Sequence, residues 1–471
     1  MKKILSNYAY QAIYQIVRIL MLTITIPIVA KSLNPNGVGI YNYTYSITSY
    51  FIMFSALGVS LYGSKEIAIV RNDREKLSLV FWEIFTLKVL LTLVNILAFC
   101  FLAYFMDDSY YLYIQSFSIL SVMFDITWLF IGVEDFKYIM LSSFASQVII
   151  FGLIIKLIQS PEDLGKYIFI QSMSFLIPQL FPWFQLKKYV SYYKVTIVQS
   201  MKHLKGMLAL FIPQISIIVY TTLNKTLLGI FDGMKNVGYY SSSLTMNQLF
   251  ITLITSFDTV MLPRMSNLYA NKKNNMLDLL KEILNGQLYV SIPLMFGMMT
   301  VNQKFVPWFL GTDYLFVTKL IPLVSVLIVV IPLGSTIAKQ YLIPIGNVKI
   351  YNYSVFWGAV ISLIINGLFL NKFGIYATVM ATILTESFVS FSRLTNLRVT
   401  TGFTLDYYKI GSYLVAGFLM YLMTTRLTEQ LDASLLTNCI QVGIAVPIYL
   451  LITTLVKTNP LLRFFKKTGE V

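Results

Sequence analysis

Nearly the whole chain divides into apolar stretches that are long enough to cross a membrane. About fourteen such stretches can be marked in the 471 residues, and a helix of about 20 residues spans a hydrocarbon core about 30 Å thick. The composition agrees, because 57% of the residues are hydrophobic, only 12% are charged, and the mean hydropathy is +0.70. The sequence therefore predicts an all-α, polytopic membrane protein. We place the spans at 8–33, 38–63, 78–104, 110–131, 136–158, 164–186, 206–231, 237–262, 282–301, 316–338, 350–370, 374–397, 407–425 and 436–456.

The segments between these spans are too short to form a domain of their own. Each holds at most about twenty residues, which cannot bury a hydrophobic core. The first span lacks the short apolar run and cleavage site of a secretory signal, so we expect it to remain in the mature protein. Cys100 and Cys439 fall in different spans and predict neither a disulfide nor a metal site. We therefore expect no catalytic residues and no metal.

The distribution of basic residues predicts the orientation in the membrane. Most of the 36 Lys and Arg residues fall on the side that holds the N-terminus, and cationic loops tend to remain in the cytoplasm. We therefore predict that both termini are cytoplasmic. The densest basic loop, at 187–205, is interpreted as a topology signal that also attracts anionic lipid, with substrate docking as the alternative. His203 lies in this loop and is assigned no chemical role, and the net charge of +15 indicates a membrane surface rather than nucleic acid.

A short repeat suggests that the chain has two related halves. VGIY at 38–41 opens the second span, VGYY at 237–240 opens the eighth, and FGIY at 373–376 opens the twelfth. Six helices separate the first two copies, so the halves have the same orientation and a symmetry axis along the membrane normal, as in transporters with two bundles around a central cavity. We predict an N-terminal lobe of helices 1–6 at 1–198, a C-terminal lobe of helices 7–12 at 199–400, and helices 13–14 with a cytoplasmic tail at 401–471.

Seven of the charged residues inside the predicted spans are candidates for a role in the membrane. Leaving all of them in lipid would cost on the order of 20 kcal/mol, so most must face protein or water. Glu83 and Asp258 lie near the inner interface, where a structural or capping role is favoured. The others are Arg18, Lys88, Asp125, Lys225 and Glu386.

Polar residues at helical spacing form stripes on several of these spans. Gln11, Gln15, Arg18 and Thr25 share one face of the first span, and Gln214 shares a face of the seventh with Lys225. A hydrated cavity would explain such stripes, and hydrogen bonding between packed helices is the alternative. We predict these substrate-binding candidates: Arg18, Lys88, Lys225, Gln11, Gln15 and Gln214.

Three acidic residues are candidates for coupling transport to an ion. Asp125, Glu386 and Asp258 could each bind H⁺ or Na⁺, although Asp125 and Glu386 could instead pair with a basic neighbour such as Lys88 or Arg393. The sequence contains no Walker A loop, so ATP hydrolysis is not predicted. We expect no cofactor, and energy from an ion gradient, the membrane potential or the substrate gradient.

The order of several short motifs resembles that of polysaccharide repeat-unit flippases of the Wzx type. This family lies in the superfamily that also holds multidrug and toxic compound exporters and lipid II flippases. Asn224 stands where such proteins often have an acid before the basic residue, which departs from their pattern. The resemblance runs over most of the chain and rests on PIVAKSL at 27–33, GVGIY at 37–41, LGVSLYG at 57–63, FIPQ at 211–214, NKTLLG at 224–229, VGYY at 237–240 and VMLPR at 260–264.

The resemblance implies a bacterial plasma-membrane flippase rather than an enzyme. Its substrate would be a glycan linked to a polyprenyl pyrophosphate, moved from the inner to the outer leaflet by alternating access for surface polysaccharide synthesis. Besides membrane lipids, its partners could include a polymerase and other assembly proteins. Arg18, Lys88 and Lys225 could neutralise the pyrophosphate.

Three other functions remain open from the sequence. A multidrug exporter of the same superfamily would carry organic cations by ion antiport, and a lipid II flippase would carry a related lipid-linked substrate. A membrane glycan polymerase or glycosyltransferase would need a sizeable outer loop with acidic or arginine-rich active-site residues. The longest predicted outer loop, 302–315, carries only Lys304 and Asp313 as charged residues, which argues against this enzyme class.

Overall fold

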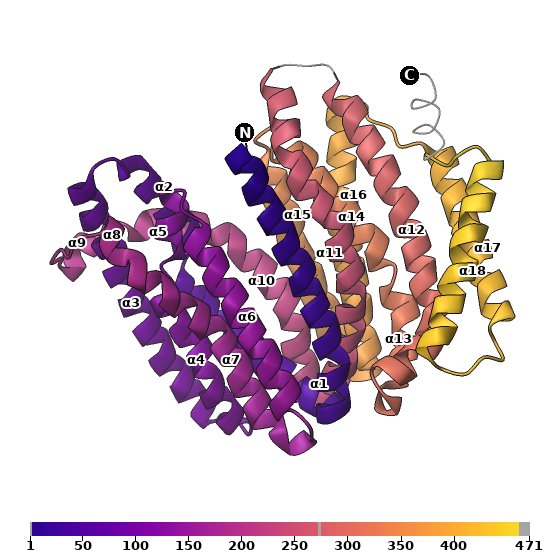
Figure 1. Ribbon diagram of the computed structural model, residues 1–471, viewed down its shortest axis with the longest axis horizontal. Coiled ribbons are helices and arrows are strands. Elements are labelled where there is room, and N and C mark those ends of the chain that lie inside the picture. Colours follow the sequence, from indigo (N-terminus) through magenta and orange to yellow (C-terminus); the bar gives the residue numbers. More distant parts are fainter. Residues whose placement is uncertain (1, 272–274, 461–471) are drawn as a thin grey trace. The chain divides into compact units, whose positions relative to one another are not determined.

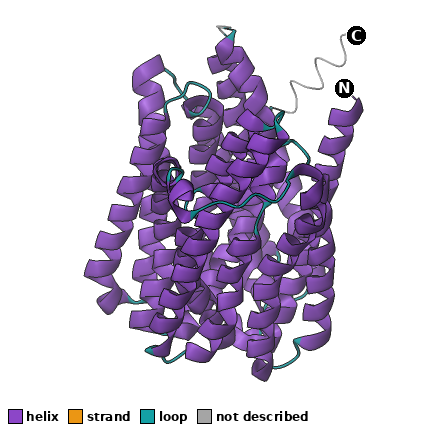
Figure 2. Ribbon diagram, turned by 90° about the vertical axis from the view of Figure 1, so that its left-hand side faces the viewer, coloured by secondary structure: helices purple, strands orange, loops and turns teal. Residues whose placement is uncertain are grey.

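The computed structural model describes residues 2–271 and 275–460. The side chains of these residues are described except at 2–20, 22, 210, 212–214, 216, 217, 219, 220 and 259. All regular elements in this described part of the chain are helices, joined by short loops (Figure 2). The prediction of an all-α membrane protein is confirmed.

The helices group into two compact units, Met1–Gly238 and Tyr239–Val471. The first unit holds α1 to α10 and the start of α11, as labelled in Figure 1. Its elements are α1 Lys2–Ala56, α2 Val59–Val70, α3 Arg74–Tyr104, α4 Ser109–Phe124, α5 Thr127–Gly132, α6 Lys137–Leu157, η1 Pro161–Asp163, α7 Leu164–Leu180, η2 Phe181–Gln185, α8 Leu186–Tyr189, α9 Ile197–Met201 and α10 Leu204–Asp232.

The second unit holds the rest of α11 and all later helices. The π-helical turn η4 directly follows α14. Its elements are α11 Met234–Ala270, α12 Met276–Phe309, η3 Thr312–Tyr314, α13 Val317–Val324, α14 Leu327–Ile337, η4 Ala338–Leu342, α15 Val348–Phe373, α16 Ile375–Thr401, α17 Tyr407–Leu427 and α18 Leu435–Leu455.

Each of the predicted spans coincides with a helix or with a helix interrupted by a break. Nine segments of the described chain are both long and apolar enough to cross a membrane, and the first of them, Thr23–Val70, contains the predicted span 38–63 and overlaps the end of 8–33. The remaining predicted spans correspond to α7, α10, α11 and α12. The predicted repeat boundary at 198/199 stays a prediction, and α10, the first helix after it, packs against α1 in the first unit.

Local sequence explains where the long helices break. Asn34 has φ 53° and ψ 176°, so α1 is two helices joined at Asn34-Pro35, since proline disfavours helix at the residue before it. α1 ends at Ala56, and α2 starts after Gly58, whose φ of 74° suits glycine. Asp125 interrupts the fourth predicted span between α4 and α5.

The two copies of the repeated motif touch each other through their glycines. A Cβ on Gly39 would lie 1.7 Å from the carbonyl oxygen of Met234, and a Cβ on Gly238 would lie 1.9 Å from that of Pro35. Each motif therefore packs its glycine against the backbone just before the other motif. Such a reciprocal contact is typical of a two-fold relation between two equivalent segments.

Candidate functional site

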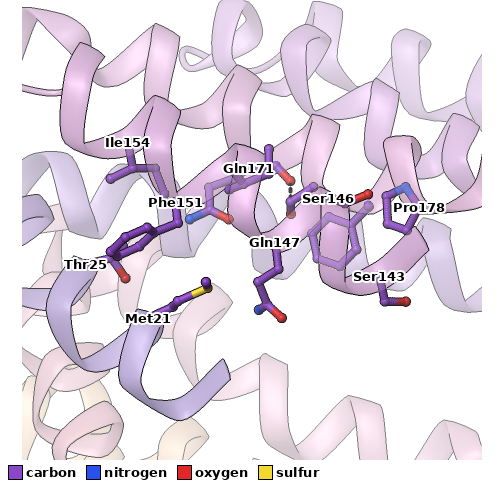
Figure 3. A pocket seen from close by; sticks show the side chains of 12 residues that line it. Met21, Thr25, Ser143, Ser146, Gln147, Phe151, Ile154, Gln171 and Pro178 are labelled. Carbon is purple, nitrogen blue, oxygen red and sulfur yellow. Dashed lines mark hydrogen bonds between the residues drawn. The ribbon is translucent and has the colours of Figure 1, made fainter. Parts of the chain in front are cut away.

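A cavity of about 350 Å³ lies among α1, α6 and α7 in the first unit. Figure 3 shows the side chains that converge on it from these helices. Six of the lining residues are hydroxyl or amide residues, two are phenylalanines, and none is charged. The lining consists of Met21, Thr25, Ser143, Ser146, Gln147, Ile150, Phe151, Ile154, Gln171, Ser174, Phe175 and Pro178.

Helical periodicity explains why these residues meet. On α6, Ser143, Ser146, Ile150 and Ile154 follow at intervals of three or four residues, and residues at this spacing share one helix face. The α7 residues of the lining, between Gln171 and Pro178, show the same spacing. Thr25, a member of the polar stripe predicted on the first span, forms part of the α1 wall.

The polar groups of this cavity are only partly satisfied by the protein. The Gln171 amide nitrogen donates to the Tyr167 hydroxyl at 3.0 Å, and the Ser174 hydroxyl donates to the Gln171 carbonyl at 2.6 Å. The Ser146 hydroxyl is buried and has no hydrogen-bond partner among the described residues. A buried unpaired hydroxyl favours a polar ligand, because such a group is costly to leave unbonded.

Four substrate candidates from the sequence have side chains outside the described residues. Gln11, Gln15 and Arg18 are in the first part of α1, and Gln214 is in α10. Their predicted role in substrate binding stays a prediction.

Lys225 on α10 meets the second half of α1. Its ammonium group donates to the Asn42 side-chain oxygen at 2.9 Å. The neighbouring Thr226 hydroxyl lies 2.7 Å from that of Ser46 and 3.3 Å from that of Tyr50. The ion pairs of the described residues do not include Lys225. Among the described residues, its ammonium group is therefore held by a neutral amide rather than by a carboxylate.

Lys88 and Asp125, predicted for different roles, are partners in the structure. The Lys88 side chain is 1% exposed, and its ammonium nitrogen lies 3.5 Å from the Asp125 carboxylate and also bonds the Asp125 carbonyl. Asp125 accepts two further bonds from Thr127, from the backbone N–H at 2.9 Å and the hydroxyl at 2.6 Å. This geometry favours the pairing considered as the alternative, and the predicted substrate role of Lys88 remains untested.

The other two acidic candidates lie in the second unit. Glu386 is half-buried on α16. Asp258 on α11 is 2% exposed and accepts hydrogen bonds from Thr336 at 2.7 Å and Ser335 at 3.2 Å. The three acidic candidates are therefore divided between the units, because Asp125 belongs to the first.

The structure gives His203 surroundings that the sequence does not indicate. The ring is 4% exposed, and its Nε2 lies 3.0 Å from one oxygen of Glu83, whose other oxygen accepts from Lys202 at 2.7 Å. The Tyr62 hydroxyl lies 2.9 Å from His203 Nδ1. This cluster ties the start of α10 to α2 and α3, which agrees with the structural role predicted for Glu83.

A second cavity, of about 310 Å³, is almost entirely apolar. It lies in the second unit among α11, α12, α17 and α18, with Phe250, Leu294, Val446 and Leu450 among its walls. Its lining offers van der Waals contact and few hydrogen bonds, so it suits a hydrocarbon group.

The long apolar helices define a multi-pass membrane protein. The family described as "Polysaccharide biosynthesis protein" matches residues 4–269, more than half of the chain. The chain therefore belongs to this family, and the resemblance predicted from its motifs is confirmed.

The chain is also similar to individual proteins in sequence or in fold. The chain is 24% identical over 269 residues to an Escherichia coli (strain K12) protein named "Putative O-antigen transporter", over 55% of this chain and 64% of that protein. The lipid II flippase MurJ in an inward closed conformation has a similar fold, with a TM-score of 0.75 and 18% identity, covering 94% of this chain and 98% of that chain. The eukaryotic MATE transporter AtDTX14 has a TM-score of 0.50 and 12% identity, with 82% and 95% covered.

Proposed function

We propose that this protein is a flippase for lipid-linked oligosaccharides in surface polysaccharide synthesis. Membership of the polysaccharide biosynthesis family supports this function, and so does the similarity to a relative named as an O-antigen transporter. The substrate would be a repeat unit carried on a polyprenyl pyrophosphate.

The observation that carries this proposal is the uncharged polar cavity among α1, α6 and α7. Sugars present many hydroxyl groups, and hydroxyl and amide side chains can donate to and accept from them. Phe151 and Phe175 add apolar surface for a sugar ring. A cavity of about 350 Å³ lies at the small end of known ligand pockets, which suits part of a glycan rather than a whole repeat unit.

The pyrophosphate of the substrate requires a positive charge outside this cavity, because the cavity lining is uncharged. Lys225 is the described candidate that fits best, because Asn42 holds it without neutralising it, and charge-assisted bonds to phosphate are strong. Arg18 remains the second candidate. Gln11 and Gln15 share its polar stripe on the first span, and Gln214 shares the stripe of Lys225 on the seventh. Lys88 is the weakest of the three basic candidates, since Asp125 already pairs with it.

Transport would proceed by alternating access, with no cofactor and no chemical conversion of the substrate. The head group and glycan enter from the cytoplasm while the lipid chain stays in the bilayer. A coupling H⁺ or Na⁺ could bind at Asp125, Glu386 or Asp258. We place the protein in the bacterial plasma membrane with both termini in the cytoplasm, where a polymerase and other assembly proteins could be its partners.

Deleting the gene tests the proposal directly. We expect loss of the surface polysaccharide and accumulation of the complete repeat unit on its lipid, measured by mass spectrometry of extracted polyprenyl-pyrophosphate oligosaccharides. Unchanged glycans together with new sensitivity to cationic drugs would overturn the flippase and favour a multidrug exporter.

Substitution of Lys225 tests the head-group site. Lys225→Ala removes the ammonium group at the Asn42 contact. Losing a charge-assisted bond of about 1.5 to 3 kcal/mol should weaken head-group binding at least tenfold and reduce surface polymer. Lys156→Ala, which removes an exposed lysine on α6, is the control and should leave polymer unchanged. Normal polymer in Lys225→Ala, at equal protein level, would show that Lys225 does not bind the head group.

A further inference from the structure

The cavity among α1, α6 and α7 contains a buried hydroxyl that the protein leaves unbonded. Ser146 on α6 lines the cavity, is 2% exposed and has no hydrogen-bond partner among the described residues. Ser142, one turn earlier on the same helix, is 3% exposed, but its hydroxyl donates to the Ile139 carbonyl at 3.0 Å. A serine in a helix can satisfy its hydroxyl in this way. The Ser146 hydroxyl instead remains available to a polar ligand in the cavity.

A row of aromatic rings fixes one apolar wall of the cavity. Phe175, which lines it, stacks on Tyr45 with the ring centroids 5.7 Å apart and 16° between the ring planes. Tyr45 stacks on Tyr41 at 5.9 Å, and Tyr41 makes an edge contact with Tyr167 at 5.0 Å. Because Phe175 is held in this row, little side-chain freedom is lost when a flat ligand packs against it.

The amides and hydroxyls around this wall match the chemistry of a sugar. Figure 3 shows the Gln147 side chain extending from α6 toward α1. The Ser174 hydroxyl donates to the Gln171 backbone carbonyl, so its oxygen can still accept. Hydroxyl and amide groups both donate and accept, as sugar hydroxyls do.

The described part of this cavity offers no counter-ion for an anion. None of its lining residues is charged, and Lys156, two residues after the lining residue Ile154, lies about 200° around the α6 helix. The side chain of Arg18 is outside the described residues, and Arg18 is a candidate for the pyrophosphate. The described lysines of α1, α6 and α7 are all exposed at the surface, namely Lys31, Lys137, Lys156 and Lys166.

An acidic sugar would be disfavoured in such a cavity for two reasons. A carboxylate that leaves water requires a paired positive charge, because neutral donors replace its hydration only in part. The face of an aromatic ring such as Phe175 also carries partial negative charge, which repels an anion.

We propose that this cavity is a subsite for an uncharged sugar of the lipid-linked glycan and that it rejects acidic sugars. The Ser146 hydroxyl bonds a hydroxyl of this sugar, and the sugar ring packs against Phe175. The inference rests on the proposed function, because that function identifies the ligand as a glycan.

Photo-cross-linking identifies the part of the substrate that occupies the cavity. The probe is the lipid-linked glycan that accumulates in the deletion strain, added to the purified full-length protein in lipid vesicles. A diazirine-bearing residue replaces Gln147, and the same residue in place of the exposed Lys156 is the control. We expect mass spectrometry to find an uncharged sugar attached at position 147 and no glycan at position 156. Attachment of an acidic sugar or the pyrophosphate at position 147, or of no glycan, overturns the subsite.

Competition tests the rejection of charge directly. The methyl glycoside of the cross-linked sugar should suppress the cross-link at a concentration at least tenfold lower than the corresponding uronic acid, since the acid brings an unpaired carboxylate. Equal suppression by the two compounds overturns the inference.

Two serine variants test the hydrogen bond without a cross-linker. Ser146→Ala should raise the KM for glycan transport into vesicles roughly three- to tenfold, as expected for one lost hydrogen bond, with the maximal rate unchanged. Ser142→Ala is the matched control, because it removes an equally buried hydroxyl outside the lining, and its KM should equal that of wild type. An unchanged KM in Ser146→Ala, or the same rise in both variants, overturns the role of Ser146.

These results separate the subsite from the proposed function. A wild-type protein that transports the glycan but cross-links an acidic sugar at position 147 keeps the flippase and overturns the subsite. A deletion strain that accumulates no lipid-linked glycan overturns both.

Discussion

The Lys88–Asp125 pair predicts that its two members differ in their effect on stability. The Lys88 side chain is 1% exposed and that of Asp125 is 27% exposed. Asp125→Asn would leave a buried ammonium group without its carboxylate, which costs about 3 to 5 kcal/mol when one partner of a buried pair is removed. Lys88→Met would leave a carboxylate that is partly hydrated and keeps both bonds from Thr127, at a cost of about 1 to 3 kcal/mol.

The double variant gives the sharpest form of this prediction. Replacing both members of a buried pair is often nearly neutral, so Lys88→Met with Asp125→Asn should be more stable than Asp125→Asn alone. We expect Asp125→Asn to lower the unfolding midpoint by roughly 10 °C, and the double variant to recover at least half of that loss.

Thermal unfolding of the purified protein in detergent, followed by tryptophan fluorescence, measures these midpoints. Trp128 is a suitable reporter, since its indole N–H donates to the Asp125 carbonyl at 3.2 Å. The reasoning is refuted if Lys88→Met destabilises as much as Asp125→Asn, or if the double variant unfolds no later than Asp125→Asn.

Two further predictions concern packing and pH. Gly39→Ala should destabilise the protein by about 3 kcal/mol or more, because its Cβ would lie 1.7 Å from the Met234 carbonyl oxygen. Gly152→Ala, at a position with open space, is the control. Equal thermal unfolding midpoints for the two variants would contradict the contact at Gly39. The hydrogen bond from Lys166, with backbone N–H groups of Gln159 and Ser160, holds the pKa of Asp163 well below its usual range. The Asp163 carboxylate therefore stabilises the fold fully above pH about 4, and this stabilisation is lost as pH falls through the lowered pKa. In Asp163→Asn the unfolding midpoint should change less with pH below about 4 than in wild type. The same pH dependence in both proteins would contradict this prediction.

Much of the fold could be predicted because membrane helices are encoded locally. A run of about 20 apolar residues is enough to specify a span, and each predicted span is helical in the structure. The break at Asp125 was not predicted, because the apolar run at 110–131 indicated one continuous span. The stripe on the first span was informative, because Thr25 on it lines the polar cavity.

Most partners of the charged residues could not be predicted from the sequence. Glu83 and His203 are 120 residues apart, and the sequence placed the histidine in a loop without a role. Asp258 and Thr336 are separated by 78 residues, so no local pattern connects them.

The sequence by itself determined the helices, their membrane location and the family. These features depend on hydropathy over about one span and on short motifs, which a single segment carries. Only the tertiary structure decided which partners the charged residues have. Lys88 pairs with Asp125, Lys225 donates to Asn42, and Asp258 accepts hydrogen bonds from hydroxyl groups. The physical reason is that helical periodicity fixes which residues share a face, whereas contacts between faces depend on how separate helices pack.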